Sequence, residues 1–369
     1  MSRVIRSDEF RDLCQSLRGQ PAAEGVGDWP VRQLAWLGAA GGWRWNMPQS
    51  CGGLGCSAVE LLEIYRDLSA CCLTTAFVLT QRNAACQRLL QAQAGVVSAS
   101  LLEDLAAGRV MATVGISHLT TSRQFLARPA VLAEPVAGGW VLTGTVPWAT
   151  GAASSQLLVT GATTESGLLL LAVVPLPQDS VTVRAPAELL GLSAACTSEV
   201  QLSGVYVQRG DVLQGPSERV LSGGSGSAPA AGSLSTSAVA LGFAEGALAG
   251  FANEAELRAG LVPYVGRLRQ ESRGLWEQLL RSAEGVGEMT AEQLRGRSNS
   301  LALRTAQAWL AATRGAGYQQ QHPASRAVRE SVFFLVWSCP QAVLEWQLQE
   351  LTTDWFSEEG QHCESDGSI

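Results

Sequence analysis

The chain has 369 residues and contains no lysine, because all 26 of its basic residues are arginine. Without an amine there is no Schiff-base nucleophile, no attachment point for pyridoxal phosphate, and no lysine for a phosphate-binding loop or a protein kinase. The chain also has only three histidines, His118, His322 and His362. Because they are scattered, a zinc site of clustered histidine and cysteine is not expected, and no metal is predicted.

The chain also has no excess of positive charge. The chain carries 26 basic and 33 acidic residues, for a net charge of -7, which argues against a nucleic-acid partner. The longest apolar run, Leu168–Pro177, contains two prolines and is too short to cross a bilayer. The N-terminal sequence has acids and no apolar segment of the kind found in signal peptides. The sequence therefore predicts a soluble cytoplasmic protein with no membrane partner.

The cysteines do not form the pattern of a disulfide framework. There are nine of them, an odd number, and no two have CxxC spacing. Most stand among apolar residues, which is typical of buried thiols in a reducing compartment.

Three regions differ in their hydrophobic periodicity. The N-terminal third has helical spacing, and its clearest helix starts at Ser57, which has capping-box spacing to Glu60. The middle third alternates with a period of two, and Gly138 and Gly139 indicate a hairpin turn. The predicted domains are an N-terminal helical domain over residues 1–110, a middle β domain over 111–221, a Gly/Ser-rich linker over 222–237, and a C-terminal helical bundle with an acidic tail over 238–369.

Several motifs along the chain stand in the order of a known family. The segment Gly138–Ala152 reads GGWVLTGTVPWATGA, in which a strand and a glycine turn precede Trp148 and Thr150. It resembles the middle-domain signature of the acyl-CoA dehydrogenase superfamily. Met47–Thr80 resembles the family's first-domain stretch, and Gly315–Ser331 resembles its C-terminal signature. The resemblance covers roughly the whole chain and implies an α+β fold with an N-terminal helical domain, a middle small β-barrel domain and a C-terminal helical bundle.

The resemblance also implies FAD as the cofactor. Trp148 and Thr150 would face the isoalloxazine ring, because an indole offers a flat apolar wall and a hydroxyl can hydrogen-bond near N5. As a residue type, Trp148 is equally consistent with a core aromatic. Arg267 lies in the region where family members reach the flavin pyrophosphate of a neighbouring subunit, although a solvated helix charge explains it equally well. A homodimer or homotetramer is expected.

The chain departs from the family pattern beside the expected flavin. Where the family carries a Thr-Glu-Pro element followed by Gly-Ser-Asp, this chain reads SHLTTSR from Ser117 to Arg123. Ser117 keeps a hydroxyl as a cofactor-binding candidate, and Ser122 keeps one as a substrate-binding candidate. His118 replaces the acid and is a candidate for contact with substrate and for proton transfer, although a lone histidine is more often an incidental polar residue.

A second departure concerns the catalytic base. Flavin-dependent oxidation of an acyl thioester needs a carboxylate over the α carbon, and losing it costs roughly 10² to 10⁴ in rate. By the resemblance, the family's usual glutamate falls at Ser338, and its other known location falls near Gly232. Ser338 is instead predicted to cap a helix over Gln341–Trp355. Glu245 and Glu330 are weak candidates for a substitute base, and a structural role is the commoner explanation for both.

Three functions follow from the resemblance and its departures. The first is an FAD-dependent oxidoreductase that oxidises an acyl thioester with hydride transfer to flavin N5. The second keeps the flavin but acts as a monooxygenase, and the third is a non-catalytic flavin- or acyl-binding protein. Fold alone does not choose among them, and neither the substrate nor the electron acceptor can be read from the residues.

Overall fold

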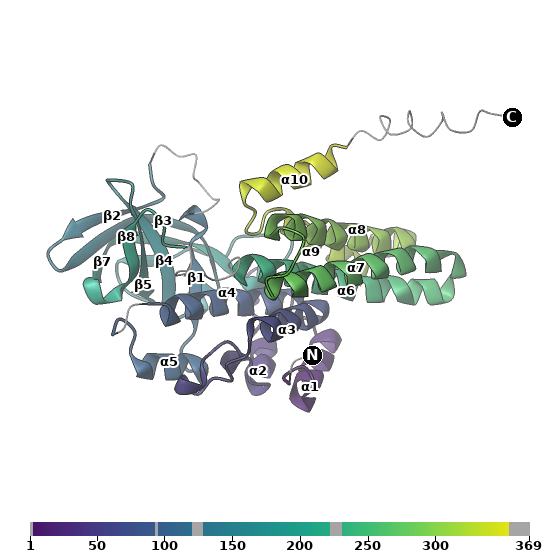
Figure 1. Cartoon of the computed structure of the whole chain (residues 1–369), viewed down its shortest axis with the longest axis horizontal. Coiled ribbons are helices and arrows are strands. Elements are labelled where there is room, and N and C mark those ends of the chain that lie inside the picture. Colours follow the sequence, from purple (N-terminus) through teal and green to yellow (C-terminus); the bar gives the residue numbers. More distant parts are fainter. Residues whose placement is uncertain (1–2, 93–94, 120–127, 222–230, 354–369) are drawn as a thin grey trace.

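The computed structural model describes residues 3–92, 95–119, 128–221 and 231–353 (Figure 1). It is a mixed α+β structure with helices at each end of the chain and a sheet between them, as the sequence predicted. Figure 1 shows the sheet at one end of an elongated molecule, with the N-terminal helices along one side of the C-terminal bundle. The N-terminal helices are α1 (Asp8–Gly19), α2 (Val31–Ala39), α3 (Ala58–Cys71), α4 (Leu73–Leu90) and α5 (Ala99–Ala106).

Local sequence signals set the ends of several helices. The predicted capping box at the start of α3 is confirmed: Glu60 N–H donates to the Ser57 hydroxyl, and Ser57 N–H donates to the Glu60 carboxylate. Gly108, with φ of 71°, follows α5 in the left-handed conformation that commonly ends a helix.

The β domain is one mixed sheet. Its strands follow the order β6-β7-β3-β2-β4-β5-β8, with β1 paired to β4. The predicted hairpin is confirmed, because β2 and β3 pair antiparallel around Gly138, whose φ is 83°. The strands are β1 (Ala112–Gly115), β2 (Val131–Val136), β3 (Gly139–Thr150), β4 (Leu157–Thr164), β5 (Leu169–Pro175), β6 (Val181–Val183), β7 (Thr197–Gln208) and β8 (Val212–Ser217).

The C-terminal bundle is built around its first helix. α6 is long and apolar enough to cross a membrane, but most of its surface is buried inside the molecule, as expected for a core helix. Gly242 and Gly246 let it approach α3 so closely that a Cβ at either position would overlap α3 backbone atoms. The helices are α6 (Ala231–Leu257), α7 (Val262–Ala283), α8 (Ala291–Gly317), α9 (Pro323–Ser331) and α10 (Gln341–Leu351).

Two expectations for this region need correction. The linker predicted over 222–237 ends earlier, because helix α6 already begins at Ala231; residues 222–230 lie outside the described residues. The predicted helix Gln341–Trp355 starts as expected but ends at Leu351, and Ser338 does not cap it. Pro340 occupies the N-cap position, and no side chain caps the helix there. Ser338 lies two residues farther back, where its φ is 45°.

Candidate functional site

Trp148 is presented to solvent by an irregularity in strand β3. Val146 pairs with Val200 of β7, and the next paired residue, Ala149, faces Ser198. Two residues of β3 therefore oppose one residue of β7, which is the arrangement of a β-bulge and re-aims the side chain within it. Trp148 is 46% exposed, so it is not a core aromatic. A flat apolar face is available on the surface of the β domain.

Hydroxyl groups lie along the strand beside this indole. Thr150, two residues on, pairs with Thr197 of β7, and their hydroxyl oxygens are 3.1 Å apart. The hydroxyl of Thr113 on β1 donates to the carbonyl of Thr150 at 2.6 Å. Thr150 is only 6% exposed, so its side chain lies beneath the surface on which Trp148 stands. The strand end is fixed by bonds from both of its neighbours.

Ser117 and His118 lie near the same strand. They belong to a short 3-10 turn, η3 (Ser117–Leu119), which follows β1. Gly115, at the end of β1, approaches Val146 of β3 so closely that an added Cβ would overlap its side chain. The turn that carries the predicted serine and histidine follows two residues later, and their contact with a flavin stays a prediction. Ser122, the other predicted substrate contact, lies outside the described residues.

The histidine of this turn is held against the sheet. His118 is 8% exposed, and its Nε2 lies 2.9 Å from the main-chain carbonyl of Gly161 on β4. Because a carbonyl only accepts, this contact requires Nε2 to carry the proton. The ring is fixed by this bond, and its role in proton transfer stays a prediction.

The position expected for the catalytic base carries no carboxylate. Ser338 is exposed and lies in the segment between the 3-10 turn η8 (Val332–Leu335) and α10. Aromatic side chains from α4, from η8 and from the residue before Ser338 pack on one another. Phe77 of α4 lies 4.8 Å from Phe333 and 5.3 Å from Trp337 between ring centroids, and Phe333 stacks on Trp337 at 5.2 Å. We refer to Phe77, Phe333 and Trp337 as the aromatic cluster.

Arg295 of α8, which the sequence did not single out, fixes the same segment. It is 2% exposed, donates from Nη2 to the Trp337 carbonyl at 2.8 Å, and lies over the Trp337 ring. Burial lowers the pKa of its guanidinium to about 9, and the nearby Cys339 opposes this change. Asn299, one turn farther along α8, donates to the Phe334 carbonyl at 2.8 Å. These two hydrogen bonds from α8 hold the segment that carries Ser338. They join residues far apart in the sequence, so no local sequence signal could have predicted them.

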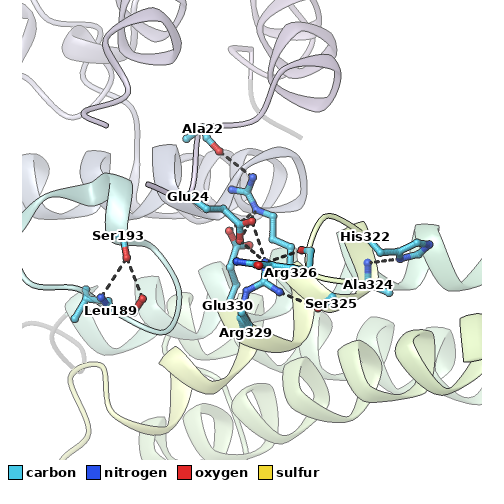
Figure 2. A network of polar contacts seen from close by, with 11 residues as sticks. Ala22, Glu24, Leu189, Ser193, His322, Ala324, Ser325, Arg326, Arg329 and Glu330 are labelled. Carbon is cyan, nitrogen blue, oxygen red and sulfur yellow. Dashed lines mark hydrogen bonds and ion pairs between the residues drawn. The ribbon is translucent and has the colours of Figure 1, made fainter. Parts of the chain in front are cut away.

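The two acids proposed as substitutes are engaged elsewhere. Glu245 of α6 lies 3.7 Å from Arg66 of α3, and burial raises the pKa of its carboxyl against the lowering effect of that arginine. Glu330 of α9 is buried, and its carboxylate accepts a hydrogen bond from Arg326 at 2.8 Å. Burial raises the pKa of this carboxyl, and Arg326 opposes the change. Figure 2 shows Glu330 and Arg326 side by side, with Glu24 approaching from the N-terminal region.

Arg267 lies in the first two turns of α7, which follows the end of α6. It lies over the ring of Tyr264, 4.7 Å from the ring centroid. Because α6 runs away from the β domain and α7 returns toward it, the start of α7 is remote from the sheet (Figure 1). Within one chain the structure does not bring Arg267 to Trp148.

Two hollows in the described part of the molecule have linings that do not include Trp148. One, of about 470 Å³, is lined by Glu24, Gln320, Gln321 and Arg326 among others. The second, of about 410 Å³, lies around Cys51 and Arg109. Among the described residues, no group of three or more His, Cys, Asp or Glu side chains is close enough to hold a metal ion.

The fold is that of the acyl-CoA dehydrogenases. Butyryl-CoA dehydrogenase from Megasphaera elsdenii matches with a TM-score of 0.77 and 15% identity, over 95% of this chain and 98% of its own. Glutaryl-CoA dehydrogenase from Mycobacterium smegmatis, in complex with FADH2, matches with a TM-score of 0.75 and 18% identity, over 95% and 96%. FkbI, a protein for biosynthesis of a methoxymalonyl extender unit, matches with a TM-score of 0.74 and 20% identity, over 92% and 98%.

These likenesses confirm at the level of fold the resemblance seen in the sequence. No protein-family model and no curated protein matches the chain. At identities of 15% to 20%, the shared architecture does not assign the reaction.

Proposed function

We propose that this chain is an FAD-dependent oxidoreductase that holds the isoalloxazine ring against Trp148. The observation that carries the proposal is the half-exposed indole on a β-bulge of β3, with the Thr150 and Thr197 hydroxyls along the same strand ends. The arrangement fits an aromatic heterocycle, because the half-exposed indole supplies a flat apolar surface and the buried hydroxyls fix the strand end that carries it. Glutaryl-CoA dehydrogenase of the same fold is described as a complex with FADH2.

The residues of this chain would hold the cofactor in distinct ways. Trp148 would cover one face of the ring and keep water from it, and Ser117 would supply a hydroxyl near its polar edge. Thr150, which is buried, would hold the strand end beneath the indole. FAD, when bound, accepts two electrons from a substrate or, once reduced, supplies them to oxygen. Arg267, remote from Trp148 in its own chain, would serve the phosphates bound by a neighbouring copy. This last role rests on the proposal that the protein is a homodimer or homotetramer.

Of the two reactions that use a flavin, the geometry supports the monooxygenase better than dehydrogenation of an acyl thioester. Dehydrogenation needs a carboxylate to remove the α proton, and Ser338 stands at the expected position. Glu245 and Glu330, the substitutes considered, are both paired with arginines. A reaction in which one oxygen atom enters the substrate and the other leaves as water does not need that base. The match to FkbI shows this fold in a protein for extender-unit biosynthesis.

Two measurements on the purified full-length protein test this proposal. Saturated with FAD and mixed anaerobically with acyl-CoA thioesters of several chain lengths, the protein is expected to keep the visible absorbance of oxidised flavin. After chemical reduction, its flavin is expected to reoxidise rapidly when oxygen is admitted. Bleaching by any acyl-CoA would support dehydrogenation instead. A protein that binds no added FAD would overturn both flavin reactions.

A further inference from the structure

The buried arginine of α8 has hydrogen-bond donors without a partner. Arg295 is 2% exposed, and its Nη2 donates to the Trp337 carbonyl at 2.8 Å. Its Nε and Nη1 atoms are shielded from solvent, and neither has a hydrogen-bond partner. Among the described residues, no Asp or Glu carboxylate forms an ion pair with this guanidinium. Because a buried charge without a partner is costly, two orphaned donors on a guanidinium point to a bound ion or a bound water.

Cys339 lies near Arg295 but does not supply a negative charge. Its sulfur lies 3.5 Å from Oε1 of Gln347 on α10, and an amide oxygen only accepts, so the thiol donates its proton in this contact. The amide orientation is fixed, because Nε2 of Gln347 donates to the Phe334 carbonyl at 3.2 Å. Burial also raises the pKa of the Cys339 thiol, and Arg295 opposes the change. Because a protonated thiol is neutral, the guanidinium needs its counter-ion from elsewhere.

A second buried arginine shows how this chain satisfies such a group without an ion. Arg82 of α4 is 1% exposed. Its Nη1 donates to the amide oxygens of Asn46 and Asn83, and its Nη2 donates to the Leu105 carbonyl. Three protein oxygens therefore surround the guanidinium of Arg82, whereas one protein oxygen accepts from that of Arg295.

Aromatic side chains close around the guanidinium of Arg295. The Trp337 ring lies over it, with the guanidinium carbon 5.2 Å from the ring centroid. Helix α10 packs closely beside the next residue of α8, because a Cβ on Gly296 would overlap the Trp346 ring. A large polar ligand would have to displace these packed rings. A small and weakly hydrated ion suits the place better, and the guanidinium is itself a weakly hydrated cation.

The hydroxyl of Ser298 adds a further donor on the same helix. Ser298 is three residues along α8 from Arg295, so the two occupy neighbouring positions on one face of the helix. It is fully buried, and its hydroxyl has no hydrogen-bond partner. Asn299 Oδ1 is also buried without a partner, but it is an acceptor and does not bind an anion. The orphaned donors of Arg295 and Ser298 outnumber this one acceptor, which favours an anion over a water.

We propose that a chloride ion binds inside the C-terminal bundle beside Arg295, held by Nε and Nη1 of the guanidinium and by the Ser298 hydroxyl. The ion balances the buried positive charge. It thereby stabilises the arginine that holds the segment carrying Ser338 through the Trp337 carbonyl. A chloride ion reaches this place by local opening of α10, whereas a substrate carboxylate does not reach a side chain that is 2% exposed. The site does not depend on the proposed flavin.

Thermal unfolding of the purified full-length protein in bromide tests the site, because bromide has the charge of chloride and nearly its size. Sodium bromide replaces sodium gluconate, whose anion is much larger, at constant ionic strength. A ligand that binds the folded state stabilises it, so the unfolding midpoint should rise by roughly 2 °C for each tenfold increase in bromide above its dissociation constant. Arg295→Met, which keeps an unbranched side chain but removes the charge, should abolish this rise.

Arg297→Met is the matched control. Arg297 lies two residues farther along the same helix and is exposed, so its replacement changes the net charge equally without touching the site. This variant should keep the full dependence on bromide. The proposal is wrong if the wild type shows no dependence on bromide, or if the midpoint of Arg295→Met rises as much as that of the wild type.

Anomalous scattering from wild-type crystals grown in bromide decides the question if Arg295→Met does not fold. A bromide peak in hydrogen-bonding contact with Nε and Nη1, together with the thermal dependence of the wild type, supports the site. A water molecule at that place overturns the proposal. A bromide peak without any thermal dependence also overturns it, because it would mean an adventitious ion only.

Discussion

The surface around Trp148 and the segment that carries Ser338 both lie where the family resemblance places chemistry, yet they are built in opposite ways. At Trp148 a bulge turns a large aromatic side chain outward and leaves it half exposed. At Ser338 the neighbouring rings, Phe77, Phe333 and Trp337, turn inward and pack on one another. An exposed aromatic face invites a ligand, whereas aromatic rings packed on one another contribute stability. On the function proposed above, the face at Trp148 would hold the cofactor, while Ser338 offers no carboxylate for proton abstraction.

The largest expected effect is on stability within the aromatic cluster. Replacing Phe77, which is 5% exposed, by alanine should lower the free energy of unfolding by about 3–5 kcal/mol, because it leaves a cavity against two other rings. Replacing Trp148 by alanine should cost about 1 kcal/mol or less. Denaturant titration measures both. Phe77→Leu, which keeps an apolar side chain at this position, serves as the control. Equal losses of unfolding free energy at Phe77 and Trp148 would contradict the distinction between a packed and an exposed aromatic side chain.

The next effect is on cofactor affinity. Trp148→Ala should weaken FAD binding by roughly tenfold to a hundredfold, because one face of the ring loses its apolar cover. Tyr206 on β7 is 55% exposed and supplies the matched control, since its replacement removes an exposed aromatic from the same domain. Flavin fluorescence titration of the apoprotein measures both variants. The account fails here if Tyr206→Ala weakens binding as much as Trp148→Ala does.

The stability of the protein should depend on pH through Glu330, as expected for a buried structural carboxyl. Burial raises its pKa above the ordinary 4.5, so the folded protein keeps a proton that the unfolded chain has released. The stability this provides is complete below pH 4.5 and is lost as the pH rises through the folded-state pKa. The unfolding midpoint of the wild type should therefore fall relative to Glu330→Gln over that window. If the difference in unfolding midpoint between the wild type and Glu330→Gln does not change with pH, Glu330 does not have a raised pKa in the folded protein.

The smallest expected effect is at position 338 itself. Ser338→Glu installs a carboxylate where the family carries one, and Ser338→Gln is its uncharged control. Because the proposed monooxygenase reaction does not need this base, anaerobic flavin reduction by acyl-CoA should differ by no more than about twofold between them. Stopped-flow absorbance gives the two rates. A carboxylate variant faster by two orders of magnitude would mean that only the base is missing.

The sequence predicted those features that depend on neighbouring residues. The capping box at Ser57 and the turn at Gly138 are confirmed, because each is decided within a few positions. Ser338 had the spacing of a helix cap but not the backbone for it, since its φ is 45° and Pro340 takes the N-cap place. Spacing alone does not report backbone conformation.

The parts that the sequence could not predict depend on contacts between distant segments. His118 bonds to Gly161, 43 residues away, and Arg295 bonds to Trp337, 42 residues away. Neither residue carries a local signal of its partner. A buried arginine that bonds to a main-chain carbonyl becomes visible only once the bundle is assembled.

The central claim is that the face around Trp148 binds FAD, and an equilibrium titration of the purified apoprotein tests it most directly. Added FAD should bind at about one molecule per chain, with quenched flavin fluorescence and a perturbed visible spectrum, as expected for a ring stacked on an indole. If FAD shows no saturable binding, or if binding is unchanged when Trp148 is replaced by alanine, the claim is wrong.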